Sequence, residues 1–251
     1  MALMIPIRDE DIEFDNGSFD TEAFARQALT NWQTLAAVID HTLLKPDATR
    51  AQVENLCDEA ARYRFACAMV NPLWVPTAVS LLSGTGVPVG VVIGFPLGAS
   101  LVSTLRQEAA ALIRLGAREI DMVLPIGQLK SGNHQAVAHT VAAVASVVHH
   151  RGAILKVILE TALLNVEEKL RAAEIAVQAG ADFLKTSTGF ASGGATPADV
   201  ALLRGVAGGR SGVKASGGIR TLADVRTLLE AGANRIGASA TVAIVRELGA
   251  E

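Results

Sequence analysis

Three of the six lysines in this chain lie in or at the end of apolar runs. Lys156 lies in ILKVILE, Lys185 ends ADFLK, and Lys214 lies in GVKAS. Lysine is normally depleted from such segments, because burial strips water from its ammonium group and lowers its pKa. A lysine that is neutral near pH 7 is a nucleophile for carbonyl carbon. A single buried lysine is also explained by a carboxylate partner, but three together favour an enzyme that forms a Schiff base.

Within this group, Lys185 is the expected nucleophile, because it stands directly before the Ser/Thr/Gly segment TSTG. Lys214 is expected to be the neighbouring cation that lowers the pKa of Lys185. Asp121, in EIDMV, is a carboxylate inside another apolar run. It is interpreted both as an ion-pair partner for a buried lysine and as a proton shuttle beside the imine. One ion pair can perform both roles.

Two glycine-rich turns predict a phosphate site. Gly217 and Gly218 lie in GGIR, before a helix expected to open at Thr221, and Gly237 and Ser239 lie in GAS, before the last expected helix. Backbone N–H groups at such helix starts bind anions. Gly189 is expected to add a third wall to this site.

Other chemistries find little support. The five histidines show neither HxH nor HExxH spacing, so no metal site is expected, and no GxSxG or P-loop motif occurs. A net charge of −3 implies no broad basic face for nucleic acid. The apolar runs are too short or too interrupted to span a bilayer. Two cysteines, Cys57 and Cys67, make no disulfide framework, which favours a reducing cytoplasm.

Strand and helix patterns alternate along the chain and must position these residues. Short apolar runs, typical of strands buried on both faces, predict strands near residues 36–41, 66–70, 88–94, 119–124, 154–160, 182–186, 212–215 and 235–238. Eight such units in 251 residues predict an α/β fold, a (β/α)8 TIM barrel. A doubly wound open sheet fits less well, because the first strand lacks a GxGxxG turn. In a barrel, catalytic groups lie at the C-terminal ends of strands, and phosphate is often held after strands seven and eight.

The helix boundaries carry start and stop signals. Helix starts are expected at Thr49 and Asn165, and glycines in LGA, AGA and AGA are expected to end helices before strands. In the helix after Asn165, we expect Val166, Leu170, Ala173 and Val177 to share one apolar face. Residues 34–251 are predicted to form a single barrel domain. Residues 1–33 are predicted to be an N-terminal extension outside the barrel, with a loop at 15–18 and a helix from Thr21.

Five segments together resemble the deoxyribose-phosphate aldolases, a family of class I aldolases. They are IDHTLLK (39–45), EIDMV (119–123), LKVILET (155–161), LKTSTGF (184–190) and VKASGGIR (213–220), and the likeness runs from about residue 35 to near residue 245. The resemblance implies a TIM barrel that reversibly cleaves 2-deoxy-D-ribose 5-phosphate to acetaldehyde and D-glyceraldehyde 3-phosphate. It implies no metal or organic cofactor, because the imine itself is the electron sink.

The same resemblance implies a role for each matching residue. Lys185 would carry the Schiff base, Lys214 would perturb it and join the proton relay, and Asp121 would be the general acid/base with a bound water. Lys156 would support the relay by pairing with carboxylates. The further supporting residues are Asp40, Thr42 and Glu160. The family is often dimeric or larger, but no residue pattern here determines a homo-oligomer.

Two positions depart from the family pattern. Phe190 stands where some members have a phosphate-contacting lysine after KTSTG, which predicts a weaker hold on phosphate and better tolerance of unphosphorylated aldehydes. Some members also carry a tyrosine in a C-terminal tail, whereas the only tyrosine here is Tyr63. Proton transfer is therefore expected to rely on water, Asp121 and the lysines.

Two alternatives stay open at this point. The first is another Schiff-base aldolase or transaldolase that acts on a sugar phosphate with a different donor. The second is an inactive barrel that binds sugar phosphates as a sensor, which would leave the buried lysines without a purpose. Fold alone does not choose between them.

Overall fold

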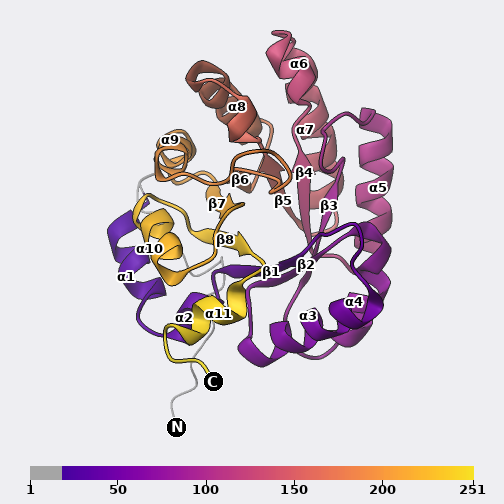
Figure 1. The fold of residues 1–251 in the computed structure, drawn as a ribbon. Coiled ribbons are helices and arrows are strands. Elements are labelled where there is room, and N and C mark those ends of the chain that lie inside the picture. Colours follow the sequence, from indigo (N-terminus) through magenta and orange to yellow (C-terminus); the bar gives the residue numbers. More distant parts are fainter. Residues whose placement is uncertain (1–18) are drawn as a thin grey trace.

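The computed structural model describes residues 19–251, and its eight parallel strands close into a barrel in chain order, β1 to β8. Figure 1 shows the helices arranged as a ring around these strands. The strands are β1 (Ile39–Leu43), β2 (Cys67–Val70), β3 (Val89–Ile93), β4 (Glu119–Val123), β5 (Ile154–Ile158), β6 (Phe183–Lys185), β7 (Gly212–Ser216) and β8 (Arg235–Ala238). The predicted (β/α)8 barrel is confirmed.

The first strand begins later than predicted. Residues 36–41 were expected to be extended, but Trp32–Ala36 forms a helical turn, α2, and β1 starts at Ile39. Asn31 causes this difference, because its side chain accepts a hydrogen bond from the backbone N–H of Thr34 in a capping box. The predicted fifth strand also ends early, at Ile158, so that Glu160 lies beyond it.

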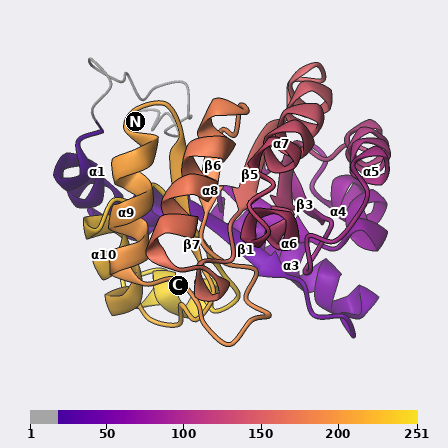
Figure 2. The ribbon, with the colours of Figure 1, turned by 90° about the horizontal axis from the view of Figure 1, so that it is seen from above.

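The helices cover the outer face of the barrel, as the view from above also shows (Figure 2). They are α1 (Thr21–Ala28), α2 (Trp32–Ala36), α3 (Arg50–Tyr63), α4 (Val75–Leu81), α5 (Val102–Arg114), α6 (Ile126–Lys130), α7 (His134–His149), α8 (Val166–Gln178), α9 (Pro197–Ala207), α10 (Leu222–Glu230) and α11 (Thr241–Arg246), with 3-10 turns η2 (Pro72–Trp74) and η3 (Thr161–Leu163).

Several predicted helix boundaries are confirmed. Thr49 and Asn165 cap α3 and α8 through complete capping boxes. The three glycines expected to end helices, Gly116, Gly180 and Gly232, all have left-handed backbone with φ between 94° and 114°. A side chain would be strained there, which is the physical reason that glycine ends these helices.

The predicted apolar face of α8 was partly wrong. Val166 and Leu170 are exposed, whereas α8 buries Ala172, Ala173, Ile175 and Ala176. The helix packs between α7 and α9 mainly through small side chains, so its larger apolar residues near the N-terminus face outward.

The described part of the N-terminal segment packs on the outside of the barrel. Helix α1 lies against α10 and α2 lies against α11, as Figure 1 shows. Phe24 of α1 is buried, and the guanidinium of Arg204 stacks over the Phe19 ring at 4.0 Å. The loop predicted at 15–18 lies outside the described residues. Between residues 19 and 251, no helix combines the length and apolar character that crossing a bilayer requires.

Candidate active site

Strand register brings the three buried lysines and Asp121 to one place inside the barrel. Lys185 of β6 is paired with Lys214 of β7, and Asp121 of β4 is paired with Lys156 of β5. Residues paired in register point to the same face of a sheet, so all four side chains share the barrel interior. Each lysine is at most 3% exposed. Sequence-distant residues therefore form one ionic cluster.

Asp121 is the hub of this cluster. Its Oδ1 accepts a hydrogen bond from Lys156 at 2.9 Å, and its Oδ2 accepts from both Lys185 and Lys214 at 2.8 Å. Burial alone would raise the pKa of Asp121, but these three ammonium groups hold it well below its usual range. The free protein thus keeps Asp121 ionised, in a state that accepts protons rather than donates them.

A second layer of charge lies deeper in the barrel. Asp40 of β1 contacts Lys214 at 2.5 Å, Arg235 of β8 at 3.0 Å and Lys156 at 3.6 Å. Glu119 of β4 also pairs with Lys156, and its other oxygen lies 3.6 Å from Arg235. Asp40 therefore lies among the lysines, as expected of a supporting residue.

Glu119 and Arg235 were missed by the sequence analysis. A usable signal existed, because Glu119 lies two residues before Asp121 on the same strand and so faces the same side. Arg235 likewise lies two residues before Gly237, in the strand RIGA. A charged residue at that spacing in a buried strand predicts a further member of the ionic cluster.

The cluster holds four basic groups and three carboxylates among the described residues: Lys156, Lys185, Lys214 and Arg235 against Asp40, Glu119 and Asp121. One cation is therefore in excess. Lys156 contacts three carboxylates and Lys214 contacts two, but Lys185 contacts only Asp121. Lys185 is consequently the group most easily deprotonated.

The electrostatics agree with this placement. Burial is the largest influence on Lys185, and with the repulsion of Lys214 it outweighs the attraction of Asp121 and lowers the pKa of Lys185 to about 8. Burial acts on Lys156 in the same direction, but Asp121, Glu119 and Asp40 raise the pKa of Lys156 well above its usual value. Lys156 and Lys185 are thus chemically different, and Lys185 is the one with nucleophilic character.

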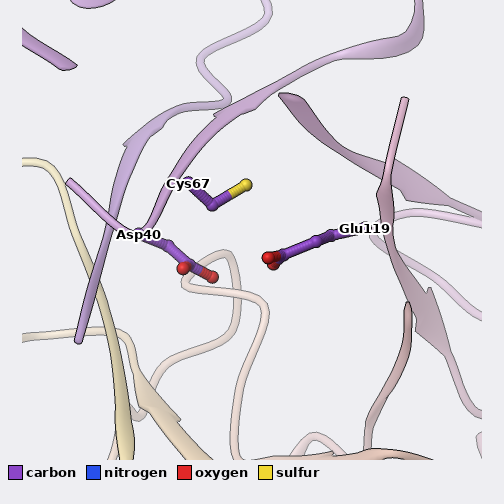
Figure 3. A group of neighbouring side chains, drawn as sticks. All are labelled: Asp40, Cys67 and Glu119. Atoms are coloured by element: carbon purple, nitrogen blue, oxygen red, sulfur yellow. The ribbon is translucent and has the colours of Figure 1, made fainter. Parts of the chain in front are cut away.

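Cys67 reaches the deep layer from β2. Figure 3 shows the side chains of Asp40, Cys67 and Glu119 converging, with one atom of each within 4.8 Å of the others. Burial, reinforced by Glu119 and Asp40, raises the pKa of Cys67 well above its usual value, so the thiol is neutral. Both carboxylates already face Lys156 and Arg235. A neutral thiol and two paired carboxylates are a poor donor set for a metal ion.

Glu160 has a different place from the lysines. It has left-handed backbone, with φ of 56°, two residues after the end of β5. Its carboxylate accepts hydrogen bonds from the backbone N–H of Thr188, at 3.3 Å, and from the Thr188 hydroxyl. Glu160 therefore holds the loop that follows Lys185. Thr42 donates from its hydroxyl to the carbonyl of Asp40 at 2.9 Å and lines the mouth of the barrel.

A cavity of about 360 Å³ opens at the C-terminal ends of the strands, and Lys185 and Lys214 lie in its wall. The five residues predicted to bind phosphate all line this same cavity: Gly189, Gly217, Gly218, Gly237 and Ser239. Gly217 and Gly218 have left-handed backbone, with φ of 87° and 80°. The structure thus brings the predicted nucleophile and the predicted phosphate loops into one pocket.

Two details of the eighth strand differ from the predicted loop. Gly237 lies within β8, and a Cβ there would stand 2.9 Å from Cε of Lys214, so the glycine makes room for that lysine. Ser239 does not open the last helix, because α11 begins at Thr241 with Ala240 as its N-cap. Ser239 is exposed beside the cavity instead.

Phe190, which follows Gly189, also forms part of the cavity wall. Its ring is half exposed and meets the Phe95 ring edge-on, with centroids 5.1 Å apart and planes at 88°. This T-shaped contact is a favoured aromatic geometry and fixes an apolar surface at the mouth.

Comparison with known proteins agrees with these features. A model of the DeoC/LacD family aldolases matches residues 34–247. A deoxyribose-phosphate aldolase of Geobacillus sp. (strain WCH70) is 53% identical over 211 residues, covering 84% of this chain and 94% of the relative. One from Thermoanaerobacter sp. (strain X514) is 53% identical over 214 residues, covering 85% and 96%. The solved deoxyribose phosphate aldolase of Aeropyrum pernix, described as tetrameric, has a TM-score of 0.84 at 36% identity and covers 91% of this chain and 96% of its own.

The family model spans the eight strands, the ionic cluster and the glycine loops alike. With relatives above 50% identity over most of the chain, this chain belongs to the DeoC/LacD family of aldolases.

Proposed function

We propose that this aldolase reversibly cleaves 2-deoxy-D-ribose 5-phosphate to acetaldehyde and D-glyceraldehyde 3-phosphate through a Schiff base on Lys185. The single observation that carries the proposal is the place of Lys185, buried in the wall of a cavity shared with glycine-rich loops, where burial lowers its pKa to about 8. A partly neutral amine is available there to attack the open-chain aldehyde. The names of the relatives supply the substrate.

In the cleavage direction, the Lys185 nitrogen attacks C1 of the sugar, and loss of water gives a protonated imine. Removal of the C3 hydroxyl proton then breaks the C2–C3 bond. The C2–C3 electron pair moves into the imine to form an enamine, and C3 becomes the aldehyde of glyceraldehyde 3-phosphate. Protonation of the enamine at C2 and hydrolysis of the imine release acetaldehyde. The imine is the electron sink, so the chemistry requires no organic cofactor.

We assign the proton transfers to the groups around Lys185. Asp121 lies 2.8 Å from both Lys185 and Lys214 and is held ionised, which suits it to accept a proton through a bound water. Lys214 supplies positive charge beside the imine. Lys156 and Asp40 position this pair by compensating their charges.

We assign the phosphate group to the end of the cavity formed by Gly189, Gly217, Gly218 and Ser239. The left-handed glycines at Gly217 and Gly218 let the backbone approach an anion closely. Phe190, which follows Gly189 in the cavity wall, offers no charge. We therefore propose that backbone N–H groups at these turns hold the phosphate.

Borohydride trapping tests the nucleophile. The enzyme is incubated with acetaldehyde, reduced, digested and mapped by mass spectrometry. We expect an ethyl adduct on Lys185 that disappears in Lys185→Met, a variant of similar side-chain volume. Lys214→Met is the matched control and retains the adduct on Lys185. An adduct on Lys214 or Lys156, or none in the wild type, would overturn the assignment.

Location and assembly are further proposals. Cys57 and Cys67 are free and buried, which supports a reducing compartment such as the cytoplasm. The tetrameric Aeropyrum pernix relative supports a homo-oligomer.

A further inference from the structure

His41 is a buried titratable residue that the proposed chemistry does not use. It lies on β1 between Asp40, which faces the ionic cluster, and Thr42, which lines the cavity. Because successive residues of a strand point to opposite faces, the His41 ring lies on the outer face of the barrel. It is 4% exposed and lies beside the Phe65 ring, with centroids 5.0 Å apart. A polar ring buried in this way requires hydrogen-bond partners.

Both nitrogens of the His41 ring have a partner. Nε2 lies 2.9 Å from a carboxylate oxygen of Glu59 on α3, and Nδ1 lies 2.6 Å from the hydroxyl oxygen of Thr241. Burial lowers the pKa of His41 and outweighs the opposing effect of Glu59, so the ring is neutral at pH 7 and carries one N–H. A carboxylate accepts hydrogen bonds, which assigns the proton to Nε2. Nδ1 therefore accepts a hydrogen bond that the Thr241 hydroxyl donates.

Thr241 connects this ring to the active-site cavity. It is fully buried and is the first residue of α11. Because β8 ends at Ala238, only Ser239 and Ala240 join the strand to the helix. Ser239 is exposed and lines the cavity together with the glycine turn after β7. A link of two residues takes its position from its two ends.

His41 contacts both ends of this link. Its backbone is the register partner of Ala238, in the pairing of β1 with β8. Its side chain accepts the hydrogen bond of Thr241 at the other end. The ring thus acts from the outer face of the barrel on a link whose other side lines the cavity.

We propose that His41 is a positioning residue for the substrate phosphate and that, through Thr241, it fixes Ser239 and Ala240 where the phosphate binds. This inference rests on the phosphate site proposed above. His41 faces away from the interior that holds Lys185. Its loss should therefore weaken the binding of a phosphorylated sugar and leave the bond-breaking steps unchanged.

Two substitutions of His41 separate the roles of its two nitrogens. In His41→Asn, the amide oxygen is attached to Cγ, as Nδ1 is, and accepts the hydrogen bond of Thr241. In His41→Gln, the amide lies one carbon farther out, at the place of Nε2, and meets Glu59 instead. Both variants remove the aromatic ring and bury an amide, so a general loss of packing affects them alike.

The measured quantities are kcat and KM for 2-deoxy-D-ribose 5-phosphate and kcat/KM for unphosphorylated 2-deoxy-D-ribose. The Ki of inorganic phosphate, as a competitor of the unphosphorylated sugar, reports on the anion site directly. In His41→Gln we expect this KM and this Ki to rise about fivefold, the scale of one neutral hydrogen bond. Both kcat and the kcat/KM for the unphosphorylated sugar should stay within about twofold of the wild type. His41→Asn should retain the wild-type KM and Ki.

Thr241→Val tests the other partner, because it keeps the shape of the side chain and removes the hydroxyl. It should raise KM and Ki as His41→Gln does, whereas Thr241→Ser, which keeps the hydroxyl, should not. Ser211→Ala is the matched control, since Ser211 is a buried hydroxyl that donates to the carbonyl of Ala181 at 2.7 Å. It directly precedes β7, at the end of the barrel opposite the cavity. Its loss should lower the melting temperature and leave KM and Ki unchanged.

Thermal unfolding confirms that each variant is folded. Unchanged KM and Ki in folded His41→Gln and Thr241→Val would overturn the inference. A rise of equal size in His41→Asn, Thr241→Ser or Ser211→Ala would also overturn it. A wild-type enzyme with equal KM for the two sugars and no inhibition by inorganic phosphate would instead contradict the proposed phosphate site, and the inference with it. The two failures are therefore distinguishable.

Discussion

At the scale of single residues, the active site depends on an unequal sharing of carboxylates among similar lysines. Lys156 and Lys214 contact several carboxylates, whereas Lys185 contacts Asp121 alone. The resulting pKa of about 8 for Lys185 is below its value in an unfolded chain, about 10.4. The lowered pKa of Lys185 reduces the free energy of unfolding by about 3 kcal/mol below pH 8, where the lysine is protonated in both the folded and the unfolded chain. This destabilisation disappears as the pH rises toward the pKa of lysine in the unfolded chain.

The rate should depend on the protonation of Lys185. Because only the neutral amine attacks the aldehyde, kcat/KM for cleavage should rise with pH and level off above about pH 8. In Lys214→Met this rise should move to higher pH, because a repelling cation is lost and Asp121 pairs more strongly with Lys185. Initial rates across the pH range measure both profiles.

Lys169→Met is the control for that comparison, since Lys169 pairs with Asp199 at 2.6 Å outside the ionic cluster. Its pH profile should match that of the wild type. A profile of Lys214→Met that moves to lower pH would contradict the role of Lys214 as the neighbouring cation.

At the scale of elements, β6, β7 and β8 with the loops that follow them have distinct structural requirements. The loop after β6 is held by Glu160, the turn after β7 uses two left-handed glycines, and β8 needs Gly237 to leave room for Lys214. Alternate residues of each strand face the barrel interior, which places the three lysines inside the barrel. The loops after the strands form the cavity above them.

Substitutions in the turn after β7 should weaken the binding of the substrate phosphate more than they slow the bond-breaking steps. In Gly217→Ala, the new Cβ would lie 3.1 Å from Cα of Gly194, on backbone with φ of 87°. We expect the KM for 2-deoxy-D-ribose 5-phosphate to rise about tenfold, equivalent to about 1.4 kcal/mol of binding. The kcat/KM for unphosphorylated 2-deoxy-D-ribose should stay within about twofold of the wild type.

Gly218→Ala is the matched comparison. It has the same backbone strain, but its Cβ would meet nothing within 4 Å, so its effect on KM should be smaller. If Gly217→Ala slowed both sugars equally, the turn would act on the reacting carbons and not on phosphate.

At the scale of the whole molecule, the closed barrel and its outer helices hold the ionic cluster away from water. The described N-terminal segment contributes to this outer layer, with Phe24 buried and Phe19 stacked beneath Arg204. Both contacts lie on the outside of the barrel, where α1 packs against α10. The segment is thus expected to affect stability rather than chemistry.

Phe24→Ala should lower the free energy of unfolding by about 3 kcal/mol, because it removes a buried aromatic side chain. The kcat of the folded enzyme should not change. Urea unfolding and initial rates measure the two effects. Gln27→Ala, at an exposed position of the same helix, should change stability by no more than about 0.5 kcal/mol. A loss of kcat in folded Phe24→Ala would place the segment in the catalytic process.

Much of the fold was predictable because its signals are local. Apolar runs, capping residues and glycine stops each act over a few residues, and all eight strands lie at or near their expected places. The exceptions also have local causes: the Asn31 capping box replaces the start of the first strand with helix, and the alanines of α8 leave Val166 and Leu170 outside.

The sequence by itself determined the barrel, the three buried lysines and the family, because residue types and short motifs carry that information directly. Only the tertiary structure decided which carboxylate each lysine meets and that Glu119 and Arg235 complete the cluster. Those contacts join residues far apart in the chain, such as Lys214 and Asp40, which are 174 positions apart. Distances of a few ångströms between such residues set the pKa values, and they arise only when the barrel closes.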